Sequence, residues 1–189
     1  MKIIITGHTS GIGKELYTHF NNDPNNVVIG LSRTTGYDLT TDIEKVIKVV
    51  SGCDLFINNT CAGECQIELV SQLHSQVGKM IVMGGTLGDY HHVFNTDYSS
   101  IKNRLKEKCR DISLLPDVSL LYLNISKLED DEGMERLIPF DRIVNFIDFW
   151  LKDSMISSVT FDLKLTDKNI KLISEKTNTT YFKNIITNE

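Results

Sequence analysis

Three glycines in one short stretch constrain this chain most, because they directly follow an apolar run near its start. Residues 6–13 read TGHTSGIG, and three isoleucines come immediately before them. Glycine is costly inside regular structure, so this spacing indicates either a tight structural turn or a backbone that approaches a ligand. A strand, a glycine-rich loop and a helix in this order are typical of phosphate binding, because the helix N-terminus presents N–H groups and a positive dipole end. We therefore expect Gly7, Gly11 and Gly13 to approach the pyrophosphate of a dinucleotide, with a purely structural turn as the alternative.

The size and charge of the chain exclude several classes of protein. With 189 residues, it has room for one domain with a substantial core. Its net charge of -5 argues against nucleic acid as a partner, since phosphate binding relies on a basic surface. No uninterrupted apolar stretch is long enough to span a bilayer, so no membrane partner is expected. Because the first strand is expected to begin at Lys2, we expect no targeting peptide and a cytoplasmic location.

Predicted strands alternate with predicted helices along most of the chain. Apolar, β-branched runs predict strands at residues 2–6, 27–31, 55–58, 80–83, 119–124 and 158–163. Helical patterns cover residues 13–20, 41–50, 67–77, 96–113 and 141–152. This order predicts an α/β fold, namely a single-domain, Rossmann-type, doubly wound parallel sheet with shortened helices. We expect residues 1–165 to form this domain and the polar residues 166–189, with a weak helical stretch at 169–175, to form a C-terminal extension.

Two of the predicted helices begin with capping signals. Thr41 and Glu44 have the spacing of a capping box, which predicts the start of the second helix. Either Asn95 or Thr96 is expected to cap the long helix that continues to about Ser113.

The form TGxxxGxG resembles the short-chain dehydrogenase/reductase superfamily, and further segments follow in the same order over residues 1–163. Asp38-Leu39 resembles the family's acidic dipeptide, whose carboxylate meets the adenine amine. Residues 57–63 read INNTCAG and resemble its asparagine-rich fourth-strand motif, and residues 98–102 read YSSIK and match its YxxxK element. Together with the second strand end, the resemblance implies cofactor contacts by Gly7, Thr9, Ser10, Gly11, Ile12, Gly13, Ser32, Arg33, Asp38, Leu39, Asn58, Asn59, Thr60, Tyr98 and Lys102.

Tyr98 and Lys102 are the predicted catalytic pair. At i and i+4 they share one helix face, so the ammonium can lie near the phenol, favour phenolate and bring the tyrosine toward acid–base chemistry at neutral pH. The family mechanism implied by the resemblance is hydride transfer between nicotinamide and a carbonyl carbon. In it, Tyr98 passes a proton to the carbonyl oxygen and Lys102 holds the nicotinamide ribose. The alternative is a surface helix on which the two residues occur by chance.

Several segments depart from the family pattern. Only four residues separate Arg33 from Asp38, so the usual helix and strand are reduced to a short connection. Too few residues follow Gly63 for the long fourth helix, which removes much of the usual dimer surface. We therefore expect a monomer or an atypical dimer. No asparagine lies between Asn59 and Asn95, so the family's helix-borne catalytic asparagine has no counterpart.

The serine that ends the family's fifth strand is also missing. Direct alignment puts Gly84-Gly85 at the usual Ser-Ser, and Thr86 follows immediately. We expect the Thr86 hydroxyl to take the serine's role, which requires a bulge of one residue. The alternative is that Thr86 only caps the following loop.

The end of the second predicted strand indicates the type of dinucleotide. It reads Leu31-Ser32-Arg33, with no carboxylate placed to bind a ribose 2′-hydroxyl. Arginine suits a 2′-phosphate, so we expect NADP rather than NAD, with a solvated Arg33 as the alternative. No metal is expected, because Cys61 and Cys65 lack a usual zinc spacing, even if His91 and His92 are added.

Three functions fit these patterns to different degrees. The leading prediction is an NADP(H)-dependent short-chain oxidoreductase acting on a small-molecule carbonyl or alcohol. The second is a catalytically impaired dinucleotide-binding protein with a regulatory or interaction role, which the missing serine and asparagine favour. The third is a nucleotide-sugar epimerase or dehydratase, for which a larger C-terminal substrate domain is usual. The loops at residues 87–94 and 126–139 are expected to shape the substrate pocket.

Overall fold

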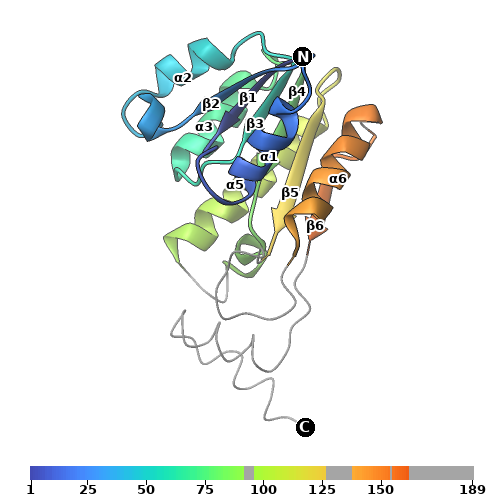
Figure 1. The fold of residues 1–189 in the computed structure, drawn as a ribbon. Helices are drawn as coiled ribbons and strands as arrows, with labels where there is room; N and C mark the ends of the chain where they lie inside the picture. The colour runs from blue at the N-terminus through green and yellow to red at the C-terminus, as the bar shows by residue number, and fades with distance from the viewer. Residues whose placement is uncertain (92–95, 127–137, 154, 162–189) are drawn as a thin grey trace.

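A six-stranded parallel sheet forms the centre of the molecule (Figure 1). The computed structural model describes residues 1–91, 96–126, 138–153 and 155–161. The strands are β1 (Lys2–Thr6), β2 (Val27–Leu31), β3 (Leu55–Asn58), β4 (Lys79–Met83), β5 (Leu120–Ile125) and β6 (Ser158–Phe161). Their order is β2-β1-β3-β4-β5-β6, and every neighbouring pair is parallel. The direction of winding therefore reverses between β1 and β3, which is where ligands bind in open parallel sheets, outside the carboxyl ends of the strands.

Helices cover both faces of this sheet. They are α1 (Gly11–Asn21), α2 (Ile43–Val50), α3 (Glu64–Leu73), α5 (Asp97–Ser113) and α6 (Phe140–Lys152), with short 3₁₀ turns η1 (Arg33–Thr35) and η2 (Thr86–Tyr90). In Figure 1, α1 and α6 lie in front of the strands, while α3 and α5 lie behind them. The two faces thus carry different helices, as a doubly wound sheet requires.

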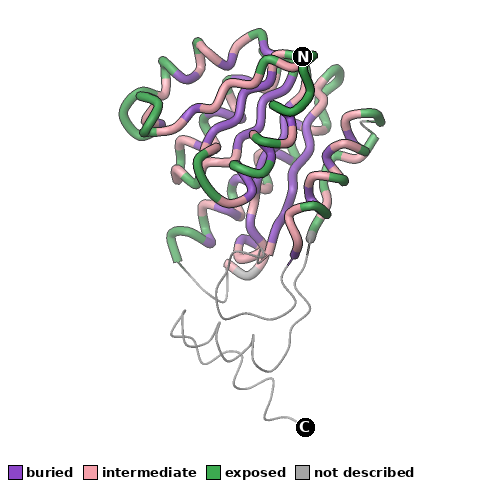
Figure 2. Tube along the Cα trace, in the orientation of Figure 1, coloured by how far each residue is buried: buried purple, intermediate pink, exposed green. Residues whose placement is uncertain are grey.

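Alternate residues of each strand supply two separate cores. Ile4, Phe56 and Val82 face the core shared with α2, α3 and α5. Ile3 and Ile57 face the core shared with α1 and α6. Both sets are buried, so the central strands are purple along their length in Figure 2. Burial on both faces explains the nearly continuous apolar runs of the sequence and confirms the predicted fold class.

Most predicted boundaries agree with the structure to within a few residues. The bounds of β1, β2 and β3 are as predicted, and those of β4 and β5 differ by one residue. Helix α3 begins three residues earlier than predicted, at Glu64, and ends at Leu73. Thr96 caps α5, and its hydroxyl accepts the Ser99 N–H in a capping box. The predicted extension at 166–189 lies outside the described residues.

The capping box predicted at Thr41 and Glu44 is wrong. Helix α2 begins at Ile43, with Asp42 as its N-cap and no side-chain capping bond. The backbone explains the difference, because the N–H groups of Thr41 and Asp42 both donate to the Asp38 carbonyl, at 3.3 and 2.8 Å. Thr41 therefore still belongs to the turn that precedes the helix.

Candidate functional site

The glycines of the first loop each have a physical reason. Gly7 and Gly11 have φ angles of 69° and 51°, which residues with a side chain rarely adopt. Gly13 lies in α1, where a Cβ would overlap the Gly7 carbonyl and the Asn59 side-chain amide. The loop therefore combines a left-handed turn with a close approach of the helix to the strand end.

The end of β3 is tied to this loop by side-chain hydrogen bonds. The Thr6 hydroxyl donates to the Ile57 carbonyl at 3.4 Å and accepts the N–H groups of Asn59 and Thr60 at 3.0 and 3.3 Å. The Asn59 amide donates to the Gly7 carbonyl at 3.1 Å. The asparagine-rich motif thus fixes the glycine loop at the point where the winding of the sheet reverses.

The N-terminus of α1 has the features of an anion site. Its first i to i−4 bond runs from the Lys14 N–H to the Ser10 carbonyl at 3.2 Å, so the N–H groups of Gly11, Ile12 and Gly13 have no helical partner. Ser10 makes no side-chain capping bond, and the first turn holds no acidic residue. The helix dipole also favours negative charge at this end.

A hollow of about 340 Å³ lies at the carboxyl ends of β1, β2 and β3. It brings together seven predicted cofactor residues, namely Gly7, Thr9, Ser32, Arg33, Asp38, Leu39 and Thr60. Ser10, Gly11, Ile12, Gly13 and Asn59 belong to the adjoining loop and helix rather than to its lining. Asn58 is fully buried, and its amide donates to the Gln66 carbonyl at 3.0 Å, so it braces α3.

The outer edge of the hollow carries one fixed carboxylate and one exposed guanidinium. Asp38 accepts hydrogen bonds from the Thr40 N–H and hydroxyl at 3.0 and 2.7 Å, and these bonds lower the pKa of its carboxyl. Arg33 lowers that pKa further by its charge. Ser32 caps η1, and its hydroxyl is within 2.8 Å of the Thr34 hydroxyl.

Among the lining residues that were not predicted from the sequence are Tyr37 and Cys61. Tyr37 follows η1, and the Lys45 ammonium lies 4.5 Å from the centroid of its ring. Cys61 lines the hollow and is close enough to influence the pKa values of both Tyr98 and Lys102. Cys61 therefore marks where the hollow meets the predicted catalytic pair.

Tyr98 and Lys102 lie one turn apart at the start of α5. Tyr98 is 42% exposed, whereas Lys102 is only 4% exposed. The Lys102 ammonium is 5.7 Å from the centroid of the Tyr98 ring. The Tyr98 hydroxyl lies 3.0 Å from where a Cβ of Gly85 would be, so it faces the end of β4. The predicted shared helix face is thus present.

The predicted shift of Tyr98 toward phenolate is wrong. Partial burial raises the pKa of Tyr98, and Cys61 adds to this shift. Burial lowers the pKa of Lys102. The Lys102 ammonium donates to the Gln66 side chain and, at 3.4 Å, to the Met83 carbonyl rather than to the phenol. Tyr98 is therefore protonated at neutral pH.

Two tyrosine hydroxyls explain the adjacent glycines at the end of β4. A Cβ on Gly84 would overlap the hydroxyl of Tyr122, and a Cβ on Gly85 would crowd the hydroxyl of Tyr98. The predicted bulge before Thr86 is not found in the ladder, because the Gly84 N–H still donates to the Leu123 carbonyl at 2.8 Å in regular register. Thr86 is half-buried and begins η2 directly.

Gln66 is a buried polar residue that was not predicted from the sequence. Its side-chain oxygen accepts from the Lys102 ammonium at 2.8 Å. Its side-chain nitrogen donates to the carbonyls of Asn58 and Met83 at 3.1 and 2.9 Å. The sequence signal was present, because Gln66 shares the buried stripe of α3 with Leu69, Val70 and Leu73.

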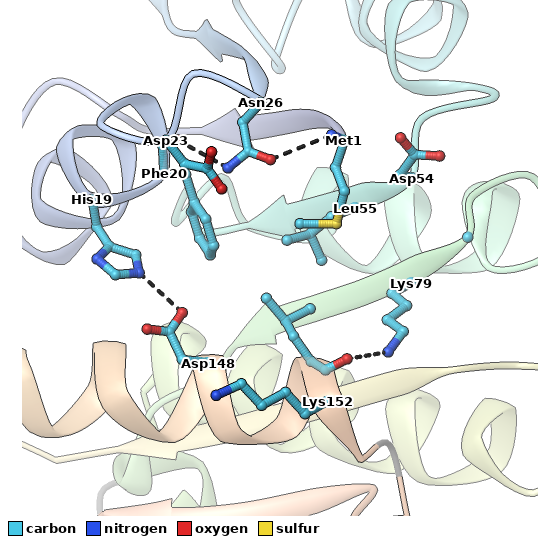
Figure 3. Close-up of a pocket in the computed structure, with 12 residues that line it drawn as sticks. Met1, His19, Phe20, Asp23, Asn26, Asp54, Leu55, Lys79, Asp148 and Lys152 are labelled. Atoms are coloured by element: carbon cyan, nitrogen blue, oxygen red, sulfur yellow. Dashed lines mark hydrogen bonds and ion pairs between the residues drawn. The ribbon is translucent and has the colours of Figure 1, made fainter.

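A second hollow, of about 850 Å³, lies at the opposite, amino ends of the strands (Figure 3). His19 and Asp148 point toward each other across it from α1 and α6, 2.9 Å apart. The Lys79 ammonium donates to the Leu151 carbonyl at 2.8 Å. None of the predicted site residues line this hollow, so it is not the predicted dinucleotide site.

The described part of the chain lacks two further features. It contains no helix long and apolar enough to cross a membrane. Within the same residues, no group of three or more histidine, cysteine, aspartate or glutamate side chains is placed to hold a metal ion.

Comparisons with known proteins agree with this architecture. An alcohol dehydrogenase specific for bulky-bulky ketones, from Comamonas testosteroni, is 12% identical with a TM-score of 0.67, over 100% of this chain and 94% of that chain. A small-chain dehydrogenase in complex with NADPH is 15% identical with a TM-score of 0.63, over 86% and 96%. UDP-glucuronic acid 4-epimerase from Bacillus cereus, in complex with NAD, is 12% identical with a TM-score of 0.63, over 95% and 85%. Neither a protein-family model nor a curated protein sequence matches the chain. The fold is thus similar to that of short-chain dehydrogenases, as the motifs predicted.

Proposed function

We propose that this chain is an NADP(H)-dependent short-chain oxidoreductase that acts on a small-molecule carbonyl or alcohol. One observation carries the proposal. The hollow at the reversal point of the sheet adjoins, through Cys61, a half-exposed Tyr98 and a buried Lys102. The structural neighbours in complex with NAD or NADPH support a nicotinamide dinucleotide as the cofactor.

The residues of the hollow suit such a cofactor. Gly7, Gly11 and Gly13 carry no side chains that would keep a pyrophosphate from the loop backbone, and the first N–H groups of α1 are available to an anion. Asp38 and Leu39 line the hollow and are proposed to contact adenine, as the family resemblance implies, and Tyr37 adds an aromatic ring to the lining. When bound, the nicotinamide would supply or accept a hydride.

Tyr98 is proposed as the proton donor to the carbonyl oxygen. Its raised pKa keeps the phenol protonated at neutral pH, which suits reduction of a carbonyl. Lys102 is proposed to bind the nicotinamide ribose, because its ammonium lies one turn below Tyr98 on the side facing β4. Thr86 is proposed to polarise the same carbonyl in place of the missing serine, but from the first position of η2 rather than through a strand bulge.

A preference for NADP over NAD is part of the proposal. Arg33 lines the hollow and is exposed, so its guanidinium can pair with a 2′-phosphate. The carboxylate in the lining of the hollow, that of Asp38, already accepts hydrogen bonds from Thr40. Replacing Arg33 with alanine is expected to weaken NADPH binding about tenfold and to leave NADH binding nearly unchanged in calorimetry. Equal losses for both cofactors would reject the preference.

A specific observation favours a second candidate, a dinucleotide-binding protein with impaired catalysis. Gly85 stands at the serine position and the ladder through Gly84 is regular, so no hydroxyl is supplied there by a shift of the strand. In either case we propose a cytoplasmic protein that is a monomer or an atypical dimer. The short α3 supports the latter, since it reduces the helical surface available for pairing.

Binding and turnover separate the two candidates. The test titrates the protein with NADPH and NADH and then screens a panel of aldehydes and ketones with the better cofactor. Tyr98→Phe and Thr86→Val follow on any substrate found, with Ser100→Ala, an exposed neighbour on α5, as the control. Loss of turnover in Tyr98→Phe alone removes Thr86 from the mechanism. Tight NADPH binding with no turnover on any carbonyl supports the second candidate.

A further inference from the structure

Gln66 occupies a position that packing alone would give to an apolar residue. It is 1% exposed and lies on α3 in the stripe that otherwise buries leucine and valine against the sheet. A buried amide is costly unless its donors and acceptor are all bonded. Gln66 is therefore expected to have hydrogen-bonding partners that an apolar side chain could not bind.

The three partners fix the orientation of the amide. Lys102 can only donate, so the side-chain oxygen of Gln66 faces its ammonium at 2.8 Å. The carbonyls of Asn58 and Met83 can only accept, so both hydrogens of the side-chain nitrogen point to them. Both hydrogens of the side-chain nitrogen are therefore bonded. Flipping the amide would exchange its oxygen and nitrogen and break all three hydrogen bonds.

This one amide joins three elements at the rim of the site. Asn58 ends β3, Met83 ends β4, and Lys102 belongs to α5. The Lys102 ammonium also reaches the Met83 carbonyl at 3.4 Å. These two bonds use two of its three hydrogens, so one remains for a group bound in the adjoining hollow.

We propose that Gln66 is the positioning residue for Lys102, holding its ammonium at the ends of β3 and β4 so that the remaining hydrogen meets the bound dinucleotide. The contact with the dinucleotide rests on the proposed function, whereas the hold on Lys102 does not. The competing explanation is a structural brace, in which Gln66 serves only the two backbone carbonyls and Lys102 lies beside it incidentally.

The acceptor and donor roles of Gln66 can be separated by two variants. Gln66→Met removes both roles, and Gln66→Glu keeps an acceptor, now charged, but loses the two donors. Gln72→Met is the matched control, because Gln72 lies on the same helix and its exposed side chain donates to Glu68. The readout is a pH titration of the full chain labelled with carbon-13 at the lysine ε position, in which Lys102→Met assigns the Lys102 signal.

Opposite shifts are the expected result. Loss of the acceptor in Gln66→Met disfavours the charged lysine and lowers the pKa of Lys102 below the wild-type value, whereas the carboxylate in Gln66→Glu raises it. Gln72→Met leaves it unchanged. Calorimetry with NADPH is expected to show about tenfold weaker binding for Gln66→Met and no change for the control.

Other outcomes overturn the proposal or only its ligand clause. A pKa of Lys102 that is the same in wild type and Gln66→Glu means that Gln66 is a brace, and this comparison stands even if Gln66→Met does not fold. If wild-type protein binds neither NADPH nor NADH, the proposed function fails, yet opposite shifts would still establish the hold on Lys102. Opposite shifts with unaltered NADPH binding would disprove the contact with the dinucleotide.

Discussion

Two loops of this molecule use adjacent or nearly adjacent glycines for different reasons. In the loop after β1, Gly7 and Gly11 provide positive φ angles, and Gly13 lets backbone approach backbone. At the end of β4, Gly85 has an extended backbone, with φ −162°, and the glycines make room for tyrosine hydroxyls. The first reason is local to the loop. The second depends on side chains from β5 and α5, so it is visible only in the folded chain.

The largest expected effect on turnover comes from removing the Tyr98 hydroxyl, for which Gly85 leaves room. Tyr98→Phe keeps the ring and removes the proposed proton donor, so turnover is expected to fall about a thousandfold, since a positioned acid contributes roughly 10²–10⁴. NADPH affinity in calorimetry is expected to stay near the wild-type value. Undiminished turnover would show that the space beside Gly85 has no catalytic use.

The pH dependence of reduction sharpens the same point. Because partial burial raises the pKa of Tyr98 above its usual 10, the phenol is protonated through the neutral range. The rate of carbonyl reduction is therefore expected to be flat from neutral pH to about pH 10 and to fall above it. A rate that declines already between pH 7 and 9 would assign the proton to another group.

The next largest effect is expected where a glycine lets two backbones meet. Gly13→Ala places a Cβ against the Gly7 carbonyl, which cannot move without the loop, so we expect about 3 kcal/mol less stability to urea. Dinucleotide binding should be lost with it. Lys14→Ala, exposed on the same helix, is the control. Since alanine is the better helix former by about 1 kcal/mol, a stabilised variant would contradict the close approach.

A smaller effect is expected where a glycine accommodates a side chain. Gly84→Ala would overlap the Tyr122 hydroxyl and is expected to cost about 2 kcal/mol of unfolding free energy. Tyr122→Phe removes that hydroxyl, so the alanine should cost much less in its background. Additive effects of the two substitutions in urea unfolding would mean that Gly84 serves its own backbone instead, as Gly7 does.

The smallest effect is expected at Gly85. A Cβ there would lie 3.0 Å from the end of the half-exposed Tyr98, which can shift. Gly85→Ser is therefore expected to change stability by less than about 1 kcal/mol and to place a hydroxyl beside the phenol. Turnover of a carbonyl substrate should rise several-fold. A fall in turnover would show that Tyr98 needs the space itself.

The parts of the fold that follow from local chemistry were predictable. The runs that form β1, β2 and β3 are mostly apolar and each contains β-branched residues, so their bounds could be predicted directly. The capping of α5 by Thr96 is likewise local. The predicted capping box at Thr41 failed because the Asp38 carbonyl binds the N–H groups of that turn, an interaction that no spacing rule contains.

The catalytic end of the site was less predictable, because its residues meet only through tertiary packing. The i to i+4 spacing correctly put Tyr98 and Lys102 on one face. It could not reveal that Lys102 turns toward Gln66, 36 positions away, rather than toward the phenol. Burial raises the pKa of Tyr98 and lowers that of Lys102, and the burial of a side chain depends on the whole fold.

The short connection after β2 also affects the edge of the sheet that β2 forms. In the described residues β2 has one neighbouring strand, β1, so its other side is an edge that a foreign strand could join. The chain turns back immediately through η1, and the Thr35 hydroxyl donates to the Gly30 carbonyl at 3.3 Å. The shortened connection thus leaves an edge strand of only five residues. The Gly30 carbonyl near its end is already bonded to the Thr35 hydroxyl. A short, partly covered edge offers little template for aggregation.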